Sequence, residues 1–286
     1  MSITVNTNIP SLTAQKSLNG ATTRMNTAME RMSTGLRINS SKDDAAGMAV
    51  ANKLDYKVGS LKVAQDNGQM GASMLDTAEG VLTVINDNLT RIRDLTEQAA
   101  NGTYGTDAMT AIKTEVQARM DEITRLSKSA EFNGKILFNP DDDNGITEDI
   151  NLQVGIKSDD NSVIKLGKAL FADAAASTIL SVSGGKVDDK YASDSTAREF
   201  LDNIDEALAD ITQRTTLLGG YQQRILSAVD AAGVMETNLT SAKSLIEDAD
   251  IAEESSNYIK SQILQQTSAS LLATANQAPS IAMNLI

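Results

Sequence analysis

Apolar residues recur with helical spacing over most of the chain. Near the N-terminus they follow a 4-3-4-3-4 spacing, which is an a/d heptad seam. The members of this seam are Ala14, Leu18, Ala21, Met25, Ala28 and Met32. Gly35 stands where such a helix is expected to end, and Asp43 and Asp44 are acidic residues of the kind that begin a helix. The pattern predicts one helix ending near Gly35 and a second beginning near Asp43.

The second predicted helix is the longest and runs to Asn101-Gly102, a common stop signal. One heptad frame places the following residues on its buried seam: Leu54, Leu61, Ala64, Gly68, Gly71, Leu75, Ala78, Leu82, Ile85, Leu89, Ile92 and Ala99. Gly68 and Gly71 are poor helix formers. Their presence on the seam predicts close approach of another element, with a local kink as the alternative.

Two further helical stretches follow. The first starts near Thr106 and is expected to bury Met109, Ile112, Val116, Met120, Ile123 and Leu126. The second starts near Ser195, with Thr196 and Glu199 as a possible capping box. Its seam is Leu201, Ile204, Leu208, Ile211, Thr215, Leu218, Gln222, Ile225, Val229 and Ala232, and helicity resumes through Leu239, Ile246, Ile259 and Ile263. The chain closes on a last 4-3-4-3 repeat, formed by Leu271, Ala275, Ala278, Ala282 and Leu285.

Between about residues 132 and 194 the helical pattern is lost. Asn133-Gly134 is a turn dipeptide, and short strands are expected at 136–138, 150–156 and 162–166. We expect this β-hairpin section to have weaker local order than the helices. The fold class is therefore mainly α, a long antiparallel coiled-coil or helical-bundle rod of N- and C-terminal helices with a small β-hairpin-containing section in the middle. Both termini would lie at one end of the rod and the middle section at the other.

Charge is unevenly distributed along the chain. The net charge is −13, yet residues 1–15 and 261–286 have no charged side chain, whereas 139–194 holds 11 acidic and 5 basic residues. The uncharged C-terminal segment is too polar for lipid. It could pack on its own domain or be buried against other copies, and the second reading is favoured because both termini share the feature.

The composition excludes several classes of function. The chain has no His and no Cys, so it has no imidazole base, no disulfide and no thiolate or His-ligated metal site. An acidic chain is unsuited to nucleic acid, and no segment resembles a membrane span or a cleavable signal. When the acidic turn at 140–145 is aligned with an EF-hand loop, both key ligand positions hold the wrong residue type. We therefore interpret this segment as a solvated turn. We expect no cofactor, no metal and no enzymatic activity.

Charged residues also flank the predicted seams. Arg91 and Arg93 lie beside seam residues, and Glu115 and Arg119 form an i,i+4 pair. A solvated helix flank is the simpler interpretation of this set, and a lateral contact surface is the alternative.

Several long motifs resemble those of bacterial flagellins. Near the N-terminus they are STGLRINSSKDDAAGMA at 33–49, TAEG at 77–80, RIRDL at 91–95 and EFNGK at 131–135. Near the C-terminus they are NLTSAKS at 238–244, IED at 246–248 and QILQQ at 262–266, extended by Ala273, Ala275, Asn276 and Gln277. The resemblance covers about 1–138 and 195–286, and Ile9-Pro10-Ser11 departs from it. The short middle section leaves no room for large outer domains.

The resemblance implies a structural subunit that polymerises into the extracellular flagellar filament for motility. It implies paired terminal helices 1–44 and 251–286 as the innermost layer, a helical rod of 45–131 and 195–250, and 132–194 at the outer surface. The implied core contacts are Leu18, Met25, Met32, Ile263, Leu264, Leu271, Ala275 and Leu285. Polar side chains of the tail would face the lumen, and charges there would be costly to bury.

Further partners follow from the same resemblance. They are the type III export apparatus, which would carry the chain without a cleavable signal, an export chaperone, and the filament cap and junction proteins. The vertebrate Toll-like receptor for flagellin is another, and its surface would comprise Arg91, Leu95, Gln98, Glu115 and Arg119. Two alternatives remain: a hook–filament junction protein with the same terminal helices, and a soluble enzyme or effector on a coiled-coil rod.

Overall fold

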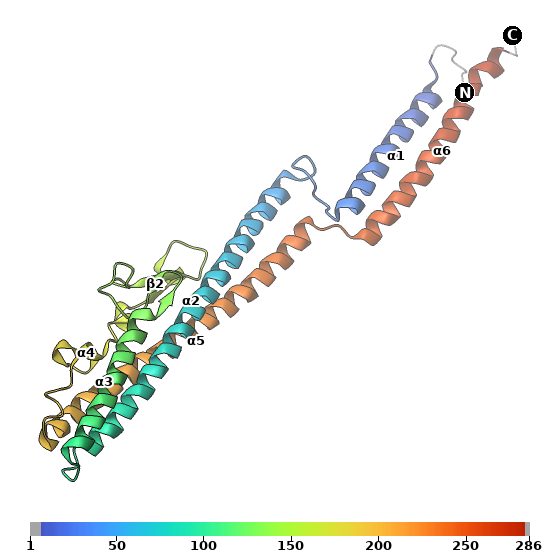
Figure 1. Ribbon diagram of the computed structural model, residues 1–286. Helices are drawn as coiled ribbons and strands as arrows, with labels where there is room; N and C mark the ends of the chain where they lie inside the picture. Colours follow the sequence, from blue (N-terminus) through green and yellow to red (C-terminus); the bar gives the residue numbers. More distant parts are fainter. Residues whose placement is uncertain (1–6, 284–286) are drawn as a thin grey trace. The chain divides into compact units, whose positions relative to one another are not determined.

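A computed structural model of the chain describes residues 7–283 and confirms the mainly-α class (Figure 1). The chain divides into two compact units, which we describe separately: unit 1 is Met1–Val58 with Thr237–Ile286, and unit 2 is Gly59–Glu236. The longer helices are α1 (Ile9–Thr34), α2 (Ala45–Ala99), α3 (Thr106–Ser129), α5 (Asp194–Glu247) and α6 (Ile251–Met283). The other elements are strands β1 (Glu131–Phe132), β2 (Lys135–Ile136), β3 (Ile150–Gln153) and β4 (Val163–Leu166), the short helix α4 (Ala176–Ile179), and three 3-10 turns at Asp160–Ser162, Lys168–Phe171 and Ser183–Gly185.

The apolar seam of α2 is the centre of unit 2. Leu75, Leu82, Ile85, Leu89 and Ile92 are all at most 1% exposed, as the heptad frame predicts. They pack with side chains of α3 and α5 that were also predicted to be buried: Val116, Met120, Ile123, Ile204, Ile211, Leu218 and Ile225. Periodicity alone therefore identified most of the helical part of this core.

The two seam glycines of α2 mark close approach rather than a kink. A Cβ atom on Gly68 would lie 2.4 Å from Val229 Cγ2 of α5, and one on Gly71 would lie 2.4 Å from Leu152 Cδ2 of β3. Helix α2 continues through both positions without interruption. Glycine is needed here because neighbouring elements occupy the space of a side chain.

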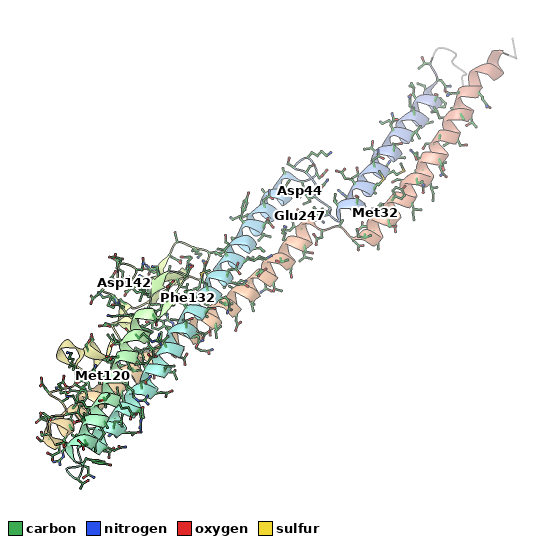
Figure 2. The ribbon with its side chains drawn as sticks, in the orientation of Figure 1. Met32, Asp44, Met120, Phe132, Asp142 and Glu247 are labelled. Atoms are coloured by element: carbon green, nitrogen blue, oxygen red, sulfur yellow. The ribbon has the colours of Figure 1, made fainter. Side chains whose placement is uncertain are left out.

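The middle section is packed rather than loosely ordered, contrary to our expectation. Phe138 and Phe171 are fully buried, with ring centroids 6.4 Å apart, and Leu166 and Leu180 are fully buried as well. Met120 and Phe132 lie among the many side chains of this part of unit 2 (Figure 2). Each apolar stretch here is too short to show a period, so the sequence pattern did not reveal this second half of the core.

Two small antiparallel hairpins form within the middle section. In the first, Glu131 pairs with Ile136 and Phe132 with Lys135, around Asn133-Gly134 with positive φ angles of 49° and 81°. In the second, Ile150 pairs with Leu166 and Gln153 with Val163. The strand expected at 136–138 is β2, which covers only Lys135–Ile136. Strands β3 and β4 are also shorter than the strands expected at 150–156 and 162–166.

Three helix boundaries differ from the expected ones. Helix α2 begins at Ala45, after Asp43, because Asp44 Oδ1 accepts hydrogen bonds from the amides of Ala46 and Gly47 at 3.0 and 2.9 Å. Helix α5 begins at Asp194, where Ser193 Oγ accepts from the amide of Thr196 at 3.3 Å, so the predicted Thr196–Glu199 capping box is wrong. It then continues to Glu247 without the break expected after Ala232.

Replacing Gly68 with alanine is expected to destabilise unit 2. The added methyl group would collide with the stiff, β-branched side chain of Val229, at a cost of about 1–3 kcal/mol. Gly80 is the matched control, because it lies in the same helix with nothing within 4 Å of its Cβ position. Gly80→Ala should stabilise the chain by up to about 1 kcal/mol. Urea denaturation followed by circular dichroism measures the free energy of unfolding of both variants. Equal changes in Gly68→Ala and Gly80→Ala would contradict the close approach of Val229 to Gly68.

Tyr191 is a buried polar residue of unit 2. It is 6% exposed, packs edge-to-face on Phe200 at 5.9 Å, and shares a hydrogen bond with the Thr96 hydroxyl. Because the Thr96 hydroxyl donates its proton to the Ile92 carbonyl oxygen, Tyr191 donates to Thr96. Burial disfavours the phenolate and raises the pKa of Tyr191 to about 12.

The raised pKa of Tyr191 makes the stability of unit 2 sensitive to alkali. An unfolded tyrosine ionises near pH 10, so between pH 10 and 12 the folded chain binds more protons than the unfolded chain. The contribution of Tyr191 to the free energy of unfolding is complete below pH 10. Between pH 10 and 12 it falls by about 1.4 kcal/mol per pH unit. Urea denaturation at pH 9 and pH 11 should show this loss in the wild type and a smaller one in Tyr191→Phe. Identical pH dependence of the two proteins would refute it.

Candidate functional site

The two terminal helices of unit 1 lie side by side and antiparallel (Figure 1). Contacts along their length fix the direction. Asn8 Nδ2 donates to the Ala275 carbonyl oxygen at 2.7 Å, Gln265 Nε2 donates to Thr22 Oγ1 at 3.1 Å, and Arg31 Nη1 donates to Glu254 Oε1 at 2.8 Å. Low residue numbers in α1 thus meet high numbers in α6, as predicted for paired N- and C-terminal helices.

The most buried side chains in the contact between the two helices recur every seven residues, and all of them except Glu254 are small. On α1 the buried residues are Ala14, Ala21 and Ala28, one in every seven positions. On α6 they are Glu254, Ser261 and Ser268, again seven residues apart. Small side chains at every seventh position let two helices approach closely, and a seven-residue period keeps them facing each other.

The predicted seam of α1 is confirmed in part. Leu18, Met25 and Met32 lie on the side of α1 that faces α6, but they are only half-buried. The alanines between them are the buried members. The larger side chains therefore flank the contact and keep part of their apolar surface exposed.

The predicted seam of α6 is wrong for this intrachain contact. Ile263 is 57% exposed, Leu264 39% and Leu271 57%, because the face against α1 carries Ser261 and Ser268 instead. Ala275 is half-buried. Leu285 and the side chains of Ala278 and Ala282 lie outside the described residues. Apolar periodicity missed the inward face of α6 because the buried residues there, Glu254, Ser261 and Ser268, are polar.

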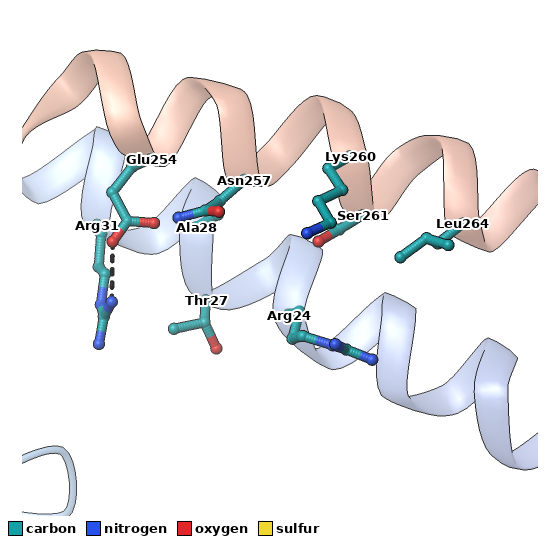
Figure 3. Close-up of a pocket in the computed structure, with 9 residues that line it drawn as sticks. All are labelled: Arg24, Thr27, Ala28, Arg31, Glu254, Asn257, Lys260, Ser261 and Leu264. Atoms are coloured by element: carbon teal, nitrogen blue, oxygen red, sulfur yellow. Dashed lines mark hydrogen bonds and ion pairs between the residues drawn. The ribbon is translucent and has the colours of Figure 1, made fainter.

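One ion pair joins the two helices at the start of α6. The side chain of Glu254 is 12% exposed and is held by Arg31, whose side chain is 30% exposed (Figure 3). Asp250 begins α6 by accepting the amides of Ala252 and Glu253 at 2.8 and 3.2 Å. This geometry ties the last turn of α1 to the first turn of α6.

The connections between helices in unit 1 are also bonded to each other. The Arg37 amide donates to the Glu247 carbonyl oxygen at 2.6 Å, and the Ala249 amide donates to the Gly35 carbonyl oxygen at 2.9 Å. Gly35 ends α1 with a φ of 74°, the left-handed conformation that glycine adopts easily. Lys243 bonds Asp55 Oδ1 at 2.6 Å, which raises the pKa of the lysine.

The predicted lateral surface lies in unit 2, and three of its five residues contact one another. Glu115 Oε1 receives Arg91 Nη2 at 3.1 Å and Arg119 Nε at 3.4 Å, and Arg119 also donates to Asn88 at 3.1 Å. Gln98 is exposed on α2. Leu95 is 3% exposed and belongs to the core, so its inclusion in this surface is corrected.

The two units differ in charge. Unit 1 has nine acidic and nine basic residues and is neutral, whereas unit 2 has 29 acidic and 16 basic residues and holds the whole net charge of −13. The neutral unit also contains the outward apolar residues of α6. Repulsion between copies would therefore arise in unit 2 and not in the paired terminal helices.

Three other kinds of site were considered: the acidic turn at 140–145, a metal-ion cluster and a membrane-spanning helix. Asp142 lies in the turn at 140–145 (Figure 2), where the Gly145 amide donates to the Asp142 carbonyl oxygen at 2.9 Å. Within residues 7–283, no group of three or more acidic side chains is placed to hold a metal ion. None of the helices in that range is long and apolar enough to cross a membrane.

Paired terminal helices with small inward and apolar outward side chains are typical of a subunit that assembles with other copies. Family models support this class: the bacterial flagellin N-terminal helical region matches residues 5–142, and the C-terminal helical region matches residues 201–286. The chain belongs to the bacterial flagellin family. Members of this family are structural proteins and not enzymes, and the chain is a structural subunit of the extracellular flagellar filament, where it polymerises with itself.

Individual relatives agree with the family models. The chain is 37% identical to a flagellin of Xenorhabdus nematophila over the full length of both, and 32% identical to the flagellar filament 33 kDa core protein of Treponema phagedenis over 99% of each. Among solved structures, Bacillus cereus flagellin matches with a TM-score of 0.50 and 24% identity, and the match covers 58% of this chain and 88% of that chain. A putative flagellar hook-associated protein from Vibrio parahaemolyticus matches with a TM-score of 0.60 and 17% identity, and the match covers 72% of this chain and 99% of that chain. These two likenesses concern the fold alone.

Removing the Arg31 side chain is expected to loosen α6 from α1. Arg31→Ala leaves the largely buried carboxylate of Glu254 without its cation, at a cost of about 1–3 kcal/mol. Lys16→Ala is the matched control, because Lys16 is an exposed cation of the same helix. Hydrogen exchange of the α6 amides in the full chain should accelerate in Arg31→Ala only. Equal exchange in the two variants would contradict the role of the pair.

Proposed function

We propose that the chain builds the flagellar filament through unit 1, with paired α1 and α6 helices packing against neighbouring copies in its innermost layer. The observation that carries this proposal is the outward face of α6. Ile259 and Ile263 lie opposite the face that contacts α1 and are each more than half exposed. Large apolar residues exposed together on a helix indicate a contact with another molecule.

The exposed apolar residues continue around α6 and onto α1. Leu264 and Leu271 flank the outward face of α6, and Ile9, Leu12 and Met29 are exposed on α1. The fully buried positions of α1 in the intrachain contact are all alanine, so large apolar side chains of this helix pair stay accessible to other copies. This division of roles supports Leu18, Met25, Met32, Ile263, Leu264, Leu271 and Ala275 as residues of the core interface. Leu285, which is outside the described residues, belongs to the same proposal.

Unit 2 would supply the lateral contacts of the rod. Arg91, Gln98, Glu115 and Arg119 are accessible on α2 and α3, and exposed ion pairs of this kind add specificity more than stability. The same surface is our proposal for recognition by the vertebrate Toll-like receptor. The layer boundaries at 44, 131, 195 and 250 belong to this proposal too, with 132–194 at the outer surface.

Assembly outside the cell requires delivery and capping. We propose export through the flagellar type III apparatus with an export chaperone on the C-terminal helix, and contact with the cap and junction proteins at the filament ends. The hook–filament junction protein remains the alternative function. Full-length identity of 37% to a flagellin favours the filament subunit, whereas the hook-associated neighbour shares only the fold.

A single charge on the outward face of α6 is expected to block assembly. Ile263→Asp would bury a carboxylate against a neighbouring copy, and burying an unpaired charge costs several kcal/mol. We expect the critical concentration for polymerisation to rise at least about tenfold, which corresponds to about 1.4 kcal/mol per contact. Sedimentation and electron microscopy after salt-induced assembly measure this change.

The control for this experiment adds the same charge elsewhere on the helix. Gln262 is the neighbouring exposed residue and lies off the outward face, so Gln262→Asp should polymerise nearly as well as wild type. Normal filaments from Ile263→Asp, or equal loss in both variants, would overturn the role proposed for the outward apolar face.

A further inference from the structure

Five Asn-Gly pairs lie along the chain, and an asparagine in such a pair can be converted into an aspartate. In this reaction the amide nitrogen of the glycine attacks the Cγ atom of the asparagine, and glycine hinders the attack least because it has no side chain. The five pairs are Asn19-Gly20, Asn67-Gly68, Asn101-Gly102, Asn133-Gly134 and Asn144-Gly145. Because all five consist of the same two residues, differences in their reactivity must come from the fold.

The glycine amide is engaged in four of the five pairs. The first two pairs lie inside α1 and α2, where the glycine amide belongs to the hydrogen-bond ladder of the helix. The Gly134 amide donates to Glu131 Oε1 at 3.1 Å. The Gly145 amide donates to the Asp142 carbonyl oxygen at 2.9 Å. Each of these hydrogen bonds must break before the nitrogen can attack, so the fold protects the four pairs.

Asn101-Gly102 differs from the other four pairs. It lies in the connection between α2 and α3, where both residues are exposed, and the Gly102 amide donates no hydrogen bond to any residue in 7–283. The Thr103 amide donates to Asn101 Oδ1 at 3.3 Å. This hydrogen bond polarises the side-chain carbonyl group. It also closes a small ring that contains both Asn101 Cγ and the Gly102 nitrogen, so the two reacting atoms are held near each other.

We propose that Asn101 is a site of spontaneous deamidation in the folded chain. Hydroxide removes the amide proton of Gly102, and the nitrogen forms a bond to Asn101 Cγ. Negative charge then develops on Oδ1, where the Thr103 amide already donates a hydrogen bond that stabilises it. The Cγ–Nδ2 bond breaks, and the side-chain nitrogen takes a proton from water and leaves as ammonia, which regenerates hydroxide.

The product of this step is a succinimide ring, which water opens. Attack of water on Cγ gives aspartate, and attack on the main-chain carbonyl carbon of residue 101 gives isoaspartate. In both cases the nitrogen of Gly102 recovers its proton, so the net reaction consumes one water molecule and releases one ammonia molecule. No cofactor or oxidant takes part.

The new carboxylate arises close to an existing one. Asn101 lines a pocket of about 380 Å³ together with Asp194, the first residue of α5. Arg198 pairs with Asp194 at 3.0 Å and also donates to the Ala100 carbonyl oxygen at 3.3 Å. Deamidation therefore adds a negative charge beside the contact between α5 and the connection that follows α2. The modification concerns unit 2 and does not depend on the proposed assembly through unit 1.

Peptide mass spectrometry of the purified full chain, incubated in mildly alkaline buffer, tests the site. The Asn101 peptide should convert at least about tenfold faster than the peptides of the other four pairs. In guanidinium chloride, where the hydrogen bonds of the fold are lost, the five rates should agree within about threefold. An equal or higher rate at Asn133 or Asn144 in the folded chain overturns the proposal, and so does a preference for Asn101 that persists in the denaturant.

A variant of the attacking residue tests the mechanism at this site. Gly102→Ala fits the fold, because the atom nearest to the added Cβ is Asp194 Oδ2 at 3.7 Å. The methyl group hinders ring closure, so conversion of Asn101 should slow at least about tenfold while the other four pairs keep their rates. Conversion at the wild-type rate would show that the Gly102 nitrogen is not the attacking group and would refute the proposal.

A second variant tests the protection by hydrogen bonding. Glu131→Ala frees the Gly134 amide, so Asn133 should convert at least about threefold faster while Asn101 is unchanged. Glu131→Gln is the matched control, because the glutamine side chain keeps an acceptor oxygen, and Asn133 should stay slow. If Asn133 converts equally in the two variants, a free glycine amide does not select the site. Circular dichroism of each variant checks that the helices are intact.

Discussion

The burial of one continuous apolar seam along α2 is the constraint on which unit 2 depends. Leu75, Leu82, Ile85, Leu89 and Ile92 are nearly inaccessible to solvent, and side chains of α3, α5 and the middle section pack with them. Gly68 and Gly71 extend the seam where no side chain fits. Because each partner element contributes to the same core, a defect in the seam would weaken several elements together.

Unit 1 is held together differently. Its helix pair buries alanine and serine, with the Arg31–Glu254 ion pair at one end, and leaves its larger apolar residues half-buried or exposed. Small side chains remove little apolar area from water, so this pairing gains less from the hydrophobic effect than the core of unit 2. The separation of charge follows the same division, since unit 1 is neutral and unit 2 has the whole −13.

Sequence patterns predicted the long helical stretches, the buried seams of α2, α3 and α5, and part of the seam of α1, but not the short helix α4 or the end of α5 at Glu247. These patterns failed where burial of a residue could not be inferred from a period of apolar residues. The inward face of α6 was missed because Ser261 and Ser268 allow close packing while Ile263 and Leu271 point away. The core of the middle section was missed because its apolar runs are short. Leu95 was misplaced because the heptad frame of α2 omits it, whereas it packs into the core of unit 2.

The error on α6 sharpens the argument about assembly. If Ile263 and Leu271 had packed on α1, the helix pair would bury its larger apolar residues by itself. Instead, Ser261 and Ser268 lie in the close intrachain contact and Ile263 and Leu271 remain exposed, which supports the proposal that this apolar surface packs against another copy.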